Sequence, residues 1–341
     1  MKKVFFTFLA ALMGFTGFVL LGELHAAAQP GSENWPTSIS ISTPPVRSGA
    51  YGANVALGSL ITKYMGIPVT VEGTPGDRAG LTILFKKESE FANASALPGW
   101  EAYRGTGQFK QLGRIPLRLV AGAHAVYLNI ATLADSGIKT IEDIKGKRLM
   151  YLNPGAVLLS ASVNAILDAY GLQGQVKALK TAGLKGSISA LVEGRTDVIA
   201  YPTGLGSGDF IELATTKPTR FISLDKSKVE KINDKRPFFS GQVLPAKTYK
   251  NQDKDVLSLG MLTATVTRDD IPESLVYAVV KMLWEHADEF RSLHPAAKEW
   301  AEDDILEMRI LPWHPGVVKY YKEKGKWTSE LEKAQQKLLS E

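Results

Sequence analysis

Two arginines are placed where they could hold a small anion. Arg47 and Arg78 each lie in a loop with Pro and Gly, "STPPVRSGAYG" and "GTPGDRAG", between a predicted strand and a predicted helix. A guanidinium group can grip a carboxylate through two parallel charge-assisted hydrogen bonds, although either arginine alone could be an ordinary surface residue. The same two loops carry further polar candidates for contact with a solute: Thr43, Ser48, Thr74 and Asp77.

A third loop of this kind, "LNPGAVLLS", contains no Cys, His, Asp or Lys and so offers no reactive group. We expect Asn153 and Gly155 to present an amide and backbone N–H groups to a bound solute. The apolar run Val157-Leu158-Leu159 suggests that the solute has an apolar portion.

The loops "NASALPGW" and "YPTGLGS" complete the predicted ligand loops. Ligand sites are mostly apolar with a few placed polar groups, so Tyr51, Trp100 and Tyr201 are candidate walls. Ser95 and Thr203 are candidate hydroxyl donors. Packing, turns and helix caps are the competing roles for all of these residues.

Signs of catalysis are missing from the sequence. A hydrolase of the G-x-S-x-G type needs that motif with His and Asp. The most similar segment, "GLGSGD", is rich in glycine but lacks that spacing. The chain has no Cys, which excludes disulfides, thiol catalysis and thiolate metal sites. His294 and His314 each precede a proline that opens a helix, which favours a helix-start role over a metal site, and His124 and His286 are isolated. We therefore expect no enzyme activity, metal or cofactor.

The elements that position these loops occur twice. Residues 38–95 read strand, loop, helix, strand, turn, helix, strand, and residues 147–202 repeat that order. With an offset of 107 residues, Thr74-Pro75-Gly76 falls on Thr181-Ala182-Gly183. The pattern predicts two α/β lobes, each a mostly parallel sheet flanked by helices, with the ligand loops at the carboxyl ends of the strands.

Two strand-like segments, 117–135 and 256–270, are placed to cross between the lobes. We expect lobe 1 to comprise 29–125 plus 255–341 and lobe 2 to comprise 126–254, with hinge closure around a solute held in the cleft between them. The protein is expected to be a monomer.

The first 28 residues have the layout of a secretory signal peptide. Lys2 and Lys3 precede the apolar stretch Val4 to Leu21, and Ala26-Ala27-Ala28 fits a cleavage site. An uncleaved anchor helix is the alternative. The formal charge of +5 is spread along the chain, which argues against nucleic-acid binding. A periplasmic location fits these features.

The chain resembles the TAXI-type substrate-binding proteins of tripartite ATP-independent periplasmic (TRAP) transporters between about residues 38 and 325. The resemblance rests on segments such as "TRDDIPESLVY", "HPAAKEW" and "LPWHPGVVKYYKEKG". It implies capture of a small organic acid, a carboxylate, and its delivery to membrane permease subunits driven by an ion gradient. A sensing module that docks to a receptor would use the same fold, and a periplasmic enzyme is the further alternative.

The sequence departs from that family's pattern in the loops themselves. A glycine-rich first loop is replaced by "STPPVRSGAYG", hydroxyl and glycine positions are taken by Val157, Leu158 and Leu159, and a polar position after the third strand is Leu97. The family's usual amino-acid or dicarboxylate ligands therefore do not carry over to this pocket.

Overall fold

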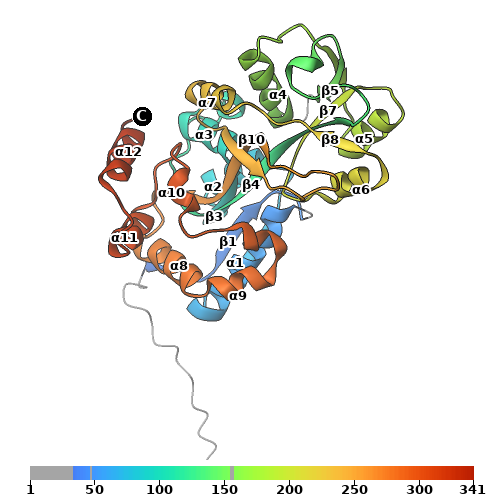
Figure 1. The fold of residues 1–341 in the computed structure, drawn as a ribbon. Coiled ribbons are helices and arrows are strands. Elements are labelled where there is room, and N and C mark those ends of the chain that lie inside the picture. The colour runs from blue at the N-terminus through green and yellow to red at the C-terminus, as the bar shows by residue number, and fades with distance from the viewer. Residues whose placement is uncertain (1–33, 47, 154–156) are drawn as a thin grey trace, which may run out of the picture.

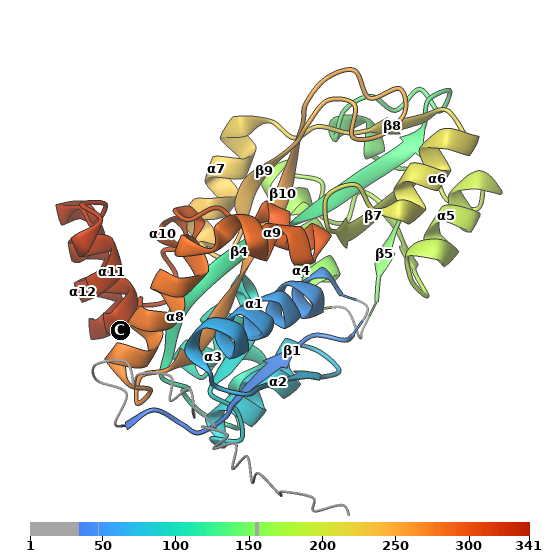
Figure 2. The same cartoon turned by 90° about the horizontal axis from the view of Figure 1, so that it is seen from below.

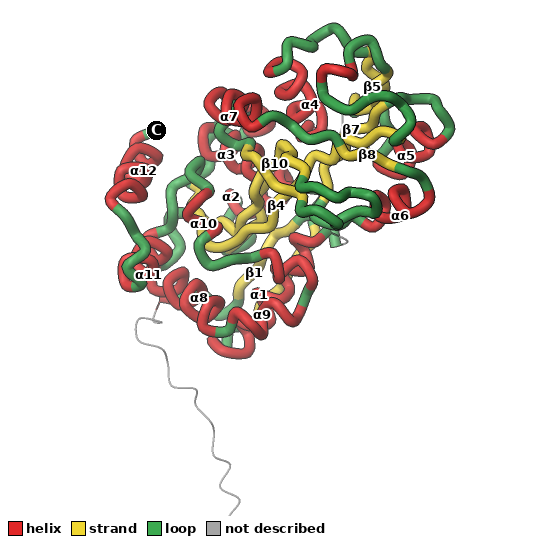
Figure 3. The backbone as a smooth tube through the Cα atoms, in the orientation of Figure 1, coloured by secondary structure: helices red, strands yellow, loops and turns green. Residues whose placement is uncertain are grey.

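The computed structural model describes residues 34–46, 48–153 and 157–341, and the predicted signal peptide lies outside them. Within these residues, ten strands form one mixed sheet in the order β2-β1-β3-β10-β4-β7-β5-β6, with β9 beside β10 and β8 beside β4. Figure 3 shows these strands running through the molecule between layers of helices. The strands are β1 (Ile39–Thr43), β2 (Val69–Gly73), β3 (Phe91–Ser95), β4 (Leu117–Leu133), β5 (Arg148–Leu152), β6 (Lys177–Lys180), β7 (Val198–Thr203), β8 (Thr219–Phe221), β9 (Ser240–Leu244) and β10 (Val256–Arg268).

The first lobe is built on the parallel strands β1, β2 and β3. Asn54 of α1 bonds to Thr265 of β10 on one face, whereas Gly80 of α2 lies against Ser42 of β1 on the other. The helices of this lobe therefore form two layers (Figure 2). The layers contain α1 (Gly49–Met65), α8 (Glu273–Glu285) and α9 (Ala287–Leu293) on the first face, and α2 (Asp77–Phe85) and α3 (Ala96–Arg104) on the second.

The second lobe is built on the parallel strands β5, β6 and β7. Val163 of α4 belongs to the large apolar core that continues into the first lobe, and Leu191 and Phe210 pack with Ile199 in a smaller core on the opposite face. These faces carry α4 (Val157–Ala169) with α7 (Lys226–Lys235), and α5 (Leu184–Val192) with α6 (Gly208–Thr216). The predicted two-lobed α/β fold is confirmed.

Two long strands, β4 and β10, connect the lobes (Figure 1). Strand β10 pairs with β3 of the first lobe, and β4 pairs with β10 and then with β7 of the second lobe, all antiparallel. The two predicted crossings are thus confirmed. They also join the two expected parallel sheets into a single mixed sheet. The lobe boundary proposed between 125 and 126 falls inside β4 and stays a prediction.

The crossing contains a β-bulge at Gly122. The register of β4 against β10 shifts between Leu262 and Ala264, and Gly122 has φ +140°. A Cβ at Gly122 would lie 2.9 Å from the Cα of Ala264, so only glycine fits this backbone. The bulge brings His124 against Thr263, with 3.1 Å between the ring Nδ1 and the hydroxyl.

The two segments with the same order of elements, 38–95 and 147–202, also share the local geometry of one turn. Thr74 Oγ1 donates to Gly76 O at 3.0 Å, and Thr181 Oγ1 donates to Gly183 O at the same distance. Helices α2 and α5 follow these turns and have nine residues each. In each turn the glycine, Gly76 or Gly183, is the N-cap of the helix that follows.

The helices after β10 complete the first lobe. The ring Nδ1 of His294 accepts from the amide of Ala296, and that of His314 accepts from the amide of Gly316, so their predicted helix-start roles are confirmed. In the part of the chain that the structure describes, no helix has the length and apolar character needed to span a membrane. The remaining helices are η2 (Gly107–Phe109), η3 (Glu142–Ile144), η4 (Pro295–Glu299), α10 (Asp304–Glu307), α11 (Pro315–Glu323) and α12 (Ser329–Ser340).

Candidate functional site

A hollow of about 700 Å³ lies where the two lobes face each other. Leu158, in the first turn of α4, supplies its wall from the second lobe. The first turns of α2, together with Pro98 of α3 and Gln108 of η2, supply the wall from the first lobe. The lining residues are Pro75, Gly76, Asp77, Arg78, Ala79, Thr82, Ile83, Pro98, Gln108 and Leu158.

The loop between β2 and α2 is held in place by the predicted hydroxyl residues. The amide and the hydroxyl of Thr74 both donate to Thr43 O, at 2.8 Å each. Thr43 Oγ1 donates to Pro44 O at 3.0 Å and to Glu72 O at 3.3 Å. Thr43 and Thr74 are buried, at 1% and 6% exposure. Their hydroxyls thus fix the backbone that presents Asp77 and Arg78 to the hollow.

Asp77 is the most unusual group in the hollow. Its Oδ2 accepts one long hydrogen bond, 3.4 Å from the amide of Ser95, and its buried Oδ1 has no hydrogen-bond partner among the described residues. Burial raises the pKa of the Asp77 carboxyl, and hydrogen bonding from Ser95 only partly opposes that shift. The neighbouring Arg78 is exposed at the mouth.

We expect Asp77→Asn to stabilise the protein near neutral pH. A folded-state pKa above the ordinary value means that the contribution of Asp77 to stability is fully present below about pH 4 and is lost as the pH rises through the folded pKa. The amide variant cannot ionise, so it should gain on the order of 1 kcal/mol at pH 7 and nothing at pH 3.5. Urea unfolding at the two pH values measures this difference.

Asp143→Asn is the matched control for Asp77→Asn. Asp143 Oδ2 accepts from the amides of Lys139 and Thr140, which lowers the pKa of its carboxyl. This substitution should therefore destabilise the protein at pH 7. Equal unfolding free energies for wild type and Asp77→Asn at pH 7 would contradict the account of Asp77.

The other candidates of the first lobe lie around the hollow rather than in its wall. Ser48 caps α1 by accepting from the amide of Tyr51 at 3.2 Å. Tyr51 lines a different hollow, of about 510 Å³, between α1 and β2. Trp100 contacts the guanidinium of Arg104, 4.7 Å from its ring centroid, and the ring of Phe238 at 5.5 Å. Arg47 lies outside the described residues.

The candidates of the second lobe share one edge of the sheet. Asn153 follows β5, and Tyr201 and Thr203 end β7, which runs parallel to β5. Gly155 lies outside the described residues. Leu158 lines the hollow, whereas Leu159 is buried in the core.

Sequence reasoning missed several residues at this site. Gln108, Pro98 and Ile83 line the hollow, and Asn129 donates from Nδ2 to Thr203 Oγ1 at 2.8 Å. Pro98 lies inside the predicted ligand loop "NASALPGW", so its position in that loop could have identified it. Gln108 and Asn129 lie outside every predicted ligand loop.

Two titratable groups near the crossing strands have shifted pKa values. Burial lowers the pKa of His124 to about 4 and raises the pKa of Glu299, in η4, to about 7. No cluster of three or more His, Asp or Glu residues suited to a metal ion occurs in 34–46, 48–153 and 157–341.

Two α/β lobes, joined by long antiparallel strands, line one hollow from both sides. The chain belongs to the NMT1-like family, whose model matches residues 41–325.

Solved structures with a related fold are distant. The periplasmic aliphatic sulphonate binding protein SsuA from Escherichia coli is 13% identical, with a TM-score of 0.48 over 88% of this chain and 94% of that chain. Substrate binding domain 2 of GlnP from Lactococcus lactis, in its open conformation, is 13% identical, with a TM-score of 0.44 over 81% of this chain and 98% of that chain. Family membership rests on the sequence match.

Proposed function

We propose that the protein captures a small organic acid with an apolar portion in the hollow between its lobes and releases it unchanged. The observation that carries this proposal is the hollow itself, because Leu158 of one lobe faces Asp77, Arg78 and Pro98 of the other across it. Its volume is in the range of sites for small molecules, roughly 300–1,000 Å³.

The chemistry of the lining supports an acid of this kind. Arg78 supplies a guanidinium at the mouth, and the hollow borders the first turn of α2, whose N–H groups and dipole favour negative charge. Leu158, Ile83 and Pro98 offer apolar surface for the remainder of the solute. Binding would draw the lobes together about β4 and β10.

We further propose a periplasmic location and delivery of the solute to permease subunits of the TRAP type, with the protein acting as a monomer. Support for this part comes from the signal-like N-terminus and from the TAXI-type segments of the sequence. The lobe division at 125/126 and 254/255 belongs to the same proposal.

Leu158→Glu should weaken acid binding by about 10-fold to 100-fold, since it places a negative charge in the wall and removes apolar contact. Calorimetric titration with aliphatic and aromatic acids, and with glutamate and 2-oxoglutarate, measures the effect. Val192→Glu is the matched control, because Val192 ends α5 and so lies at the end of that helix away from the ligand loops.

Preference for glutamate or 2-oxoglutarate over the aliphatic and aromatic acids would contradict the apolar portion. Equal affinities for wild type and Leu158→Glu would place the solute elsewhere. Turnover of any compound by the pure protein would end the binding proposal altogether.

A further inference from the structure

Gln108 lines the hollow between the lobes but belongs to none of the predicted ligand loops. It lies in η2, shortly after α3, and it is half-buried in the wall that Pro98 of α3 also forms. The amide of a glutamine carries an acceptor oxygen on one side and a donor nitrogen on the other. What Gln108 offers to a solute therefore depends on which way its amide is turned.

Glu101, in α3, fixes the direction of the Gln108 amide. Its Oε2 accepts from the backbone amide of Gln108 at 3.3 Å and from the side-chain Nε2 at 3.4 Å. A carboxylate can only accept hydrogen bonds, so the nitrogen of the Gln108 side chain has to face it. The oxygen Oε1 consequently points away from Glu101, and among the described residues only Nε2 of this amide has a partner.

The backbone between the two residues leaves room for this contact. Gly107 has φ +51°, a left-handed conformation that favours glycine, and a Cβ at this position would clash with Oε1 of Glu101. The amide of Thr106 donates to Glu101 O at 2.9 Å, so the chain folds back over the end of α3. This path places Gln108 beside the Glu101 side chain and at the wall of the hollow.

The hollow thus presents an acceptor that the proposed acid, as described so far, would not use. Arg78 and the first turn of α2 suit a carboxylate, and Leu158 and Pro98 suit an apolar portion. Neither part of the solute can donate a hydrogen bond to Oε1 of Gln108. An O–H or N–H group on the solute could, whereas a solute without one would cover this oxygen and leave it unpaired, which costs binding free energy.

We propose that Gln108 is a specificity-determining residue of the hollow, with Glu101 as its positioning residue, and that Oε1 accepts a hydrogen bond from an O–H or N–H group of the solute. This inference rests on the proposed function and refines it: the captured acid carries a donor group in addition to its carboxylate and its apolar portion.

Acids that share one skeleton and differ in a single donor group test this role. Phenylacetate has no such group, mandelate and 4-hydroxyphenylacetate add a hydroxyl, and phenylglycine adds an amino group. The aliphatic series is 4-methylpentanoate with its 2-hydroxy and 2-amino derivatives. In calorimetric titration of the wild type, at least one donor-bearing acid should bind about 10-fold more tightly than its parent acid. The acid that gains shows whether the donor is O–H or N–H.

Gln108→Leu removes the acceptor and keeps a side chain that can fill the wall. The ratio between the donor-bearing acid and its parent should fall toward one, while the affinity for the parent acid stays at the wild-type value. Gln173→Leu is the matched control, because Gln173 is an exposed glutamine of the second lobe that donates to Asn164 O at 2.9 Å and does not line the hollow. In that variant the ratio should persist.

Glu101→Gln separates positioning from packing. A glutamine at position 101 can donate as well as accept, so the Gln108 amide gains a second orientation. If this halves the competent population, the ratio should fall by about 2-fold. The affinity for the parent acids should not change, whereas a merely structural role of Glu101 would weaken the binding of all the acids alike.

Equal binding within both series, or a ratio that persists in Gln108→Leu, overturns the role of Gln108 and leaves the proposed function intact. A loss in Gln108→Leu that is the same for the parent acids as for their derivatives also overturns it, since this would show packing alone. Failure of every acid in both series to bind the wild type overturns the proposed function and this inference together.

Discussion

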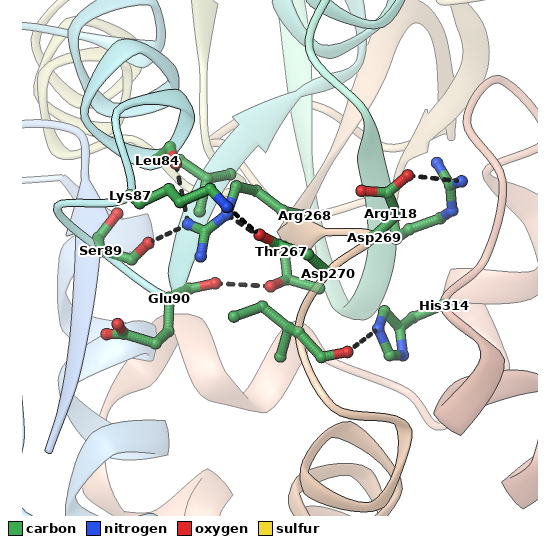
Figure 4. A network of polar contacts seen from close by, with 11 residues as sticks. Leu84, Lys87, Ser89, Glu90, Arg118, Thr267, Arg268, Asp269, Asp270 and His314 are labelled. Atoms are coloured by element: carbon green, nitrogen blue, oxygen red, sulfur yellow. Dashed lines mark hydrogen bonds and ion pairs between the residues drawn. The ribbon is translucent and has the colours of Figure 1, made fainter. Parts of the chain in front are cut away.

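Arg268→Met should cost about 2–5 kcal/mol of unfolding free energy, because it leaves two buried backbone carbonyls without a donor, at roughly 1–3 kcal/mol each. Arg268 ends β10 at 7% exposure. Its Nη1 donates to Leu84 O at 2.9 Å and to Ser89 O at 2.6 Å, and its Nε donates to Asp270 Oδ1 at 2.8 Å (Figure 4). Methionine fills similar volume but leaves all three acceptors without these bonds.

The effect should reach the hollow, because Leu84 belongs to the last turns of α2 and Arg268 ties that helix to the crossing strand. We therefore expect weaker acid binding in Arg268→Met as well as lower stability in urea. Lys87→Met is the matched control, since Lys87 meets Asp270 through an ion pair with a 67% exposed lysine side chain. That pair should contribute less than about 1 kcal/mol. A loss below 1 kcal/mol for Arg268→Met would show that water replaces the guanidinium.

The fold could be predicted from the sequence because its signals are local. The repeated order of strands and helices, and the Thr-x-Gly turns at Thr74 and Thr181, depend on residues a few positions apart. Local signals also assigned His294 and His314 to helix starts. The joining of the two sheets into one could not be predicted, because strand pairing across β4 and β10 depends on contacts between distant segments.

The residues of the candidate site could be predicted from the sequence only in part. Asp77 and Arg78, selected for their loop positions, line one hollow together with Leu158. Loop position could not show that the hydroxyls of Thr43 and Thr74 are used by the backbone, since this depends on the turn geometry. Asn129 carries no local signal at all, and only the folded chain places it beside Thr203. The roles of the candidates in binding stay predictions.

Low pH should destabilise the protein strongly through protonation of His314. This residue is 1% exposed, its Nε2–H donates to Ile271 O at 3.0 Å, and its Nδ1 accepts from the Gly316 amide at 3.2 Å. Nδ1 can accept only while the ring is neutral. Burial lowers the pKa of His314 to about 4, and the positive charge of Arg118 adds to that shift.

The sign of the pH dependence follows from these values. The unfolded chain binds the proton near pH 6.5 and the folded protein only near pH 4, so stability is fully present above about pH 6.5 and falls as the pH drops toward 4. Each unit of pKa shift corresponds to about 1.4 kcal/mol, which makes the loss from His314 on the order of 3 kcal/mol.

His314→Asn should remove that loss, because Asn can still cap α11 but does not titrate. Between pH 7.5 and 4.5, the unfolding free energy of the wild type should fall by about 2 kcal/mol more than that of the variant. His124, whose pKa burial also lowers to about 4, offers a second site with the same sign, so the double variant should lose still less. Parallel stability curves for wild type and His314→Asn across this range would mean that His314 binds its proton equally well in the folded and unfolded chain, which would contradict this account.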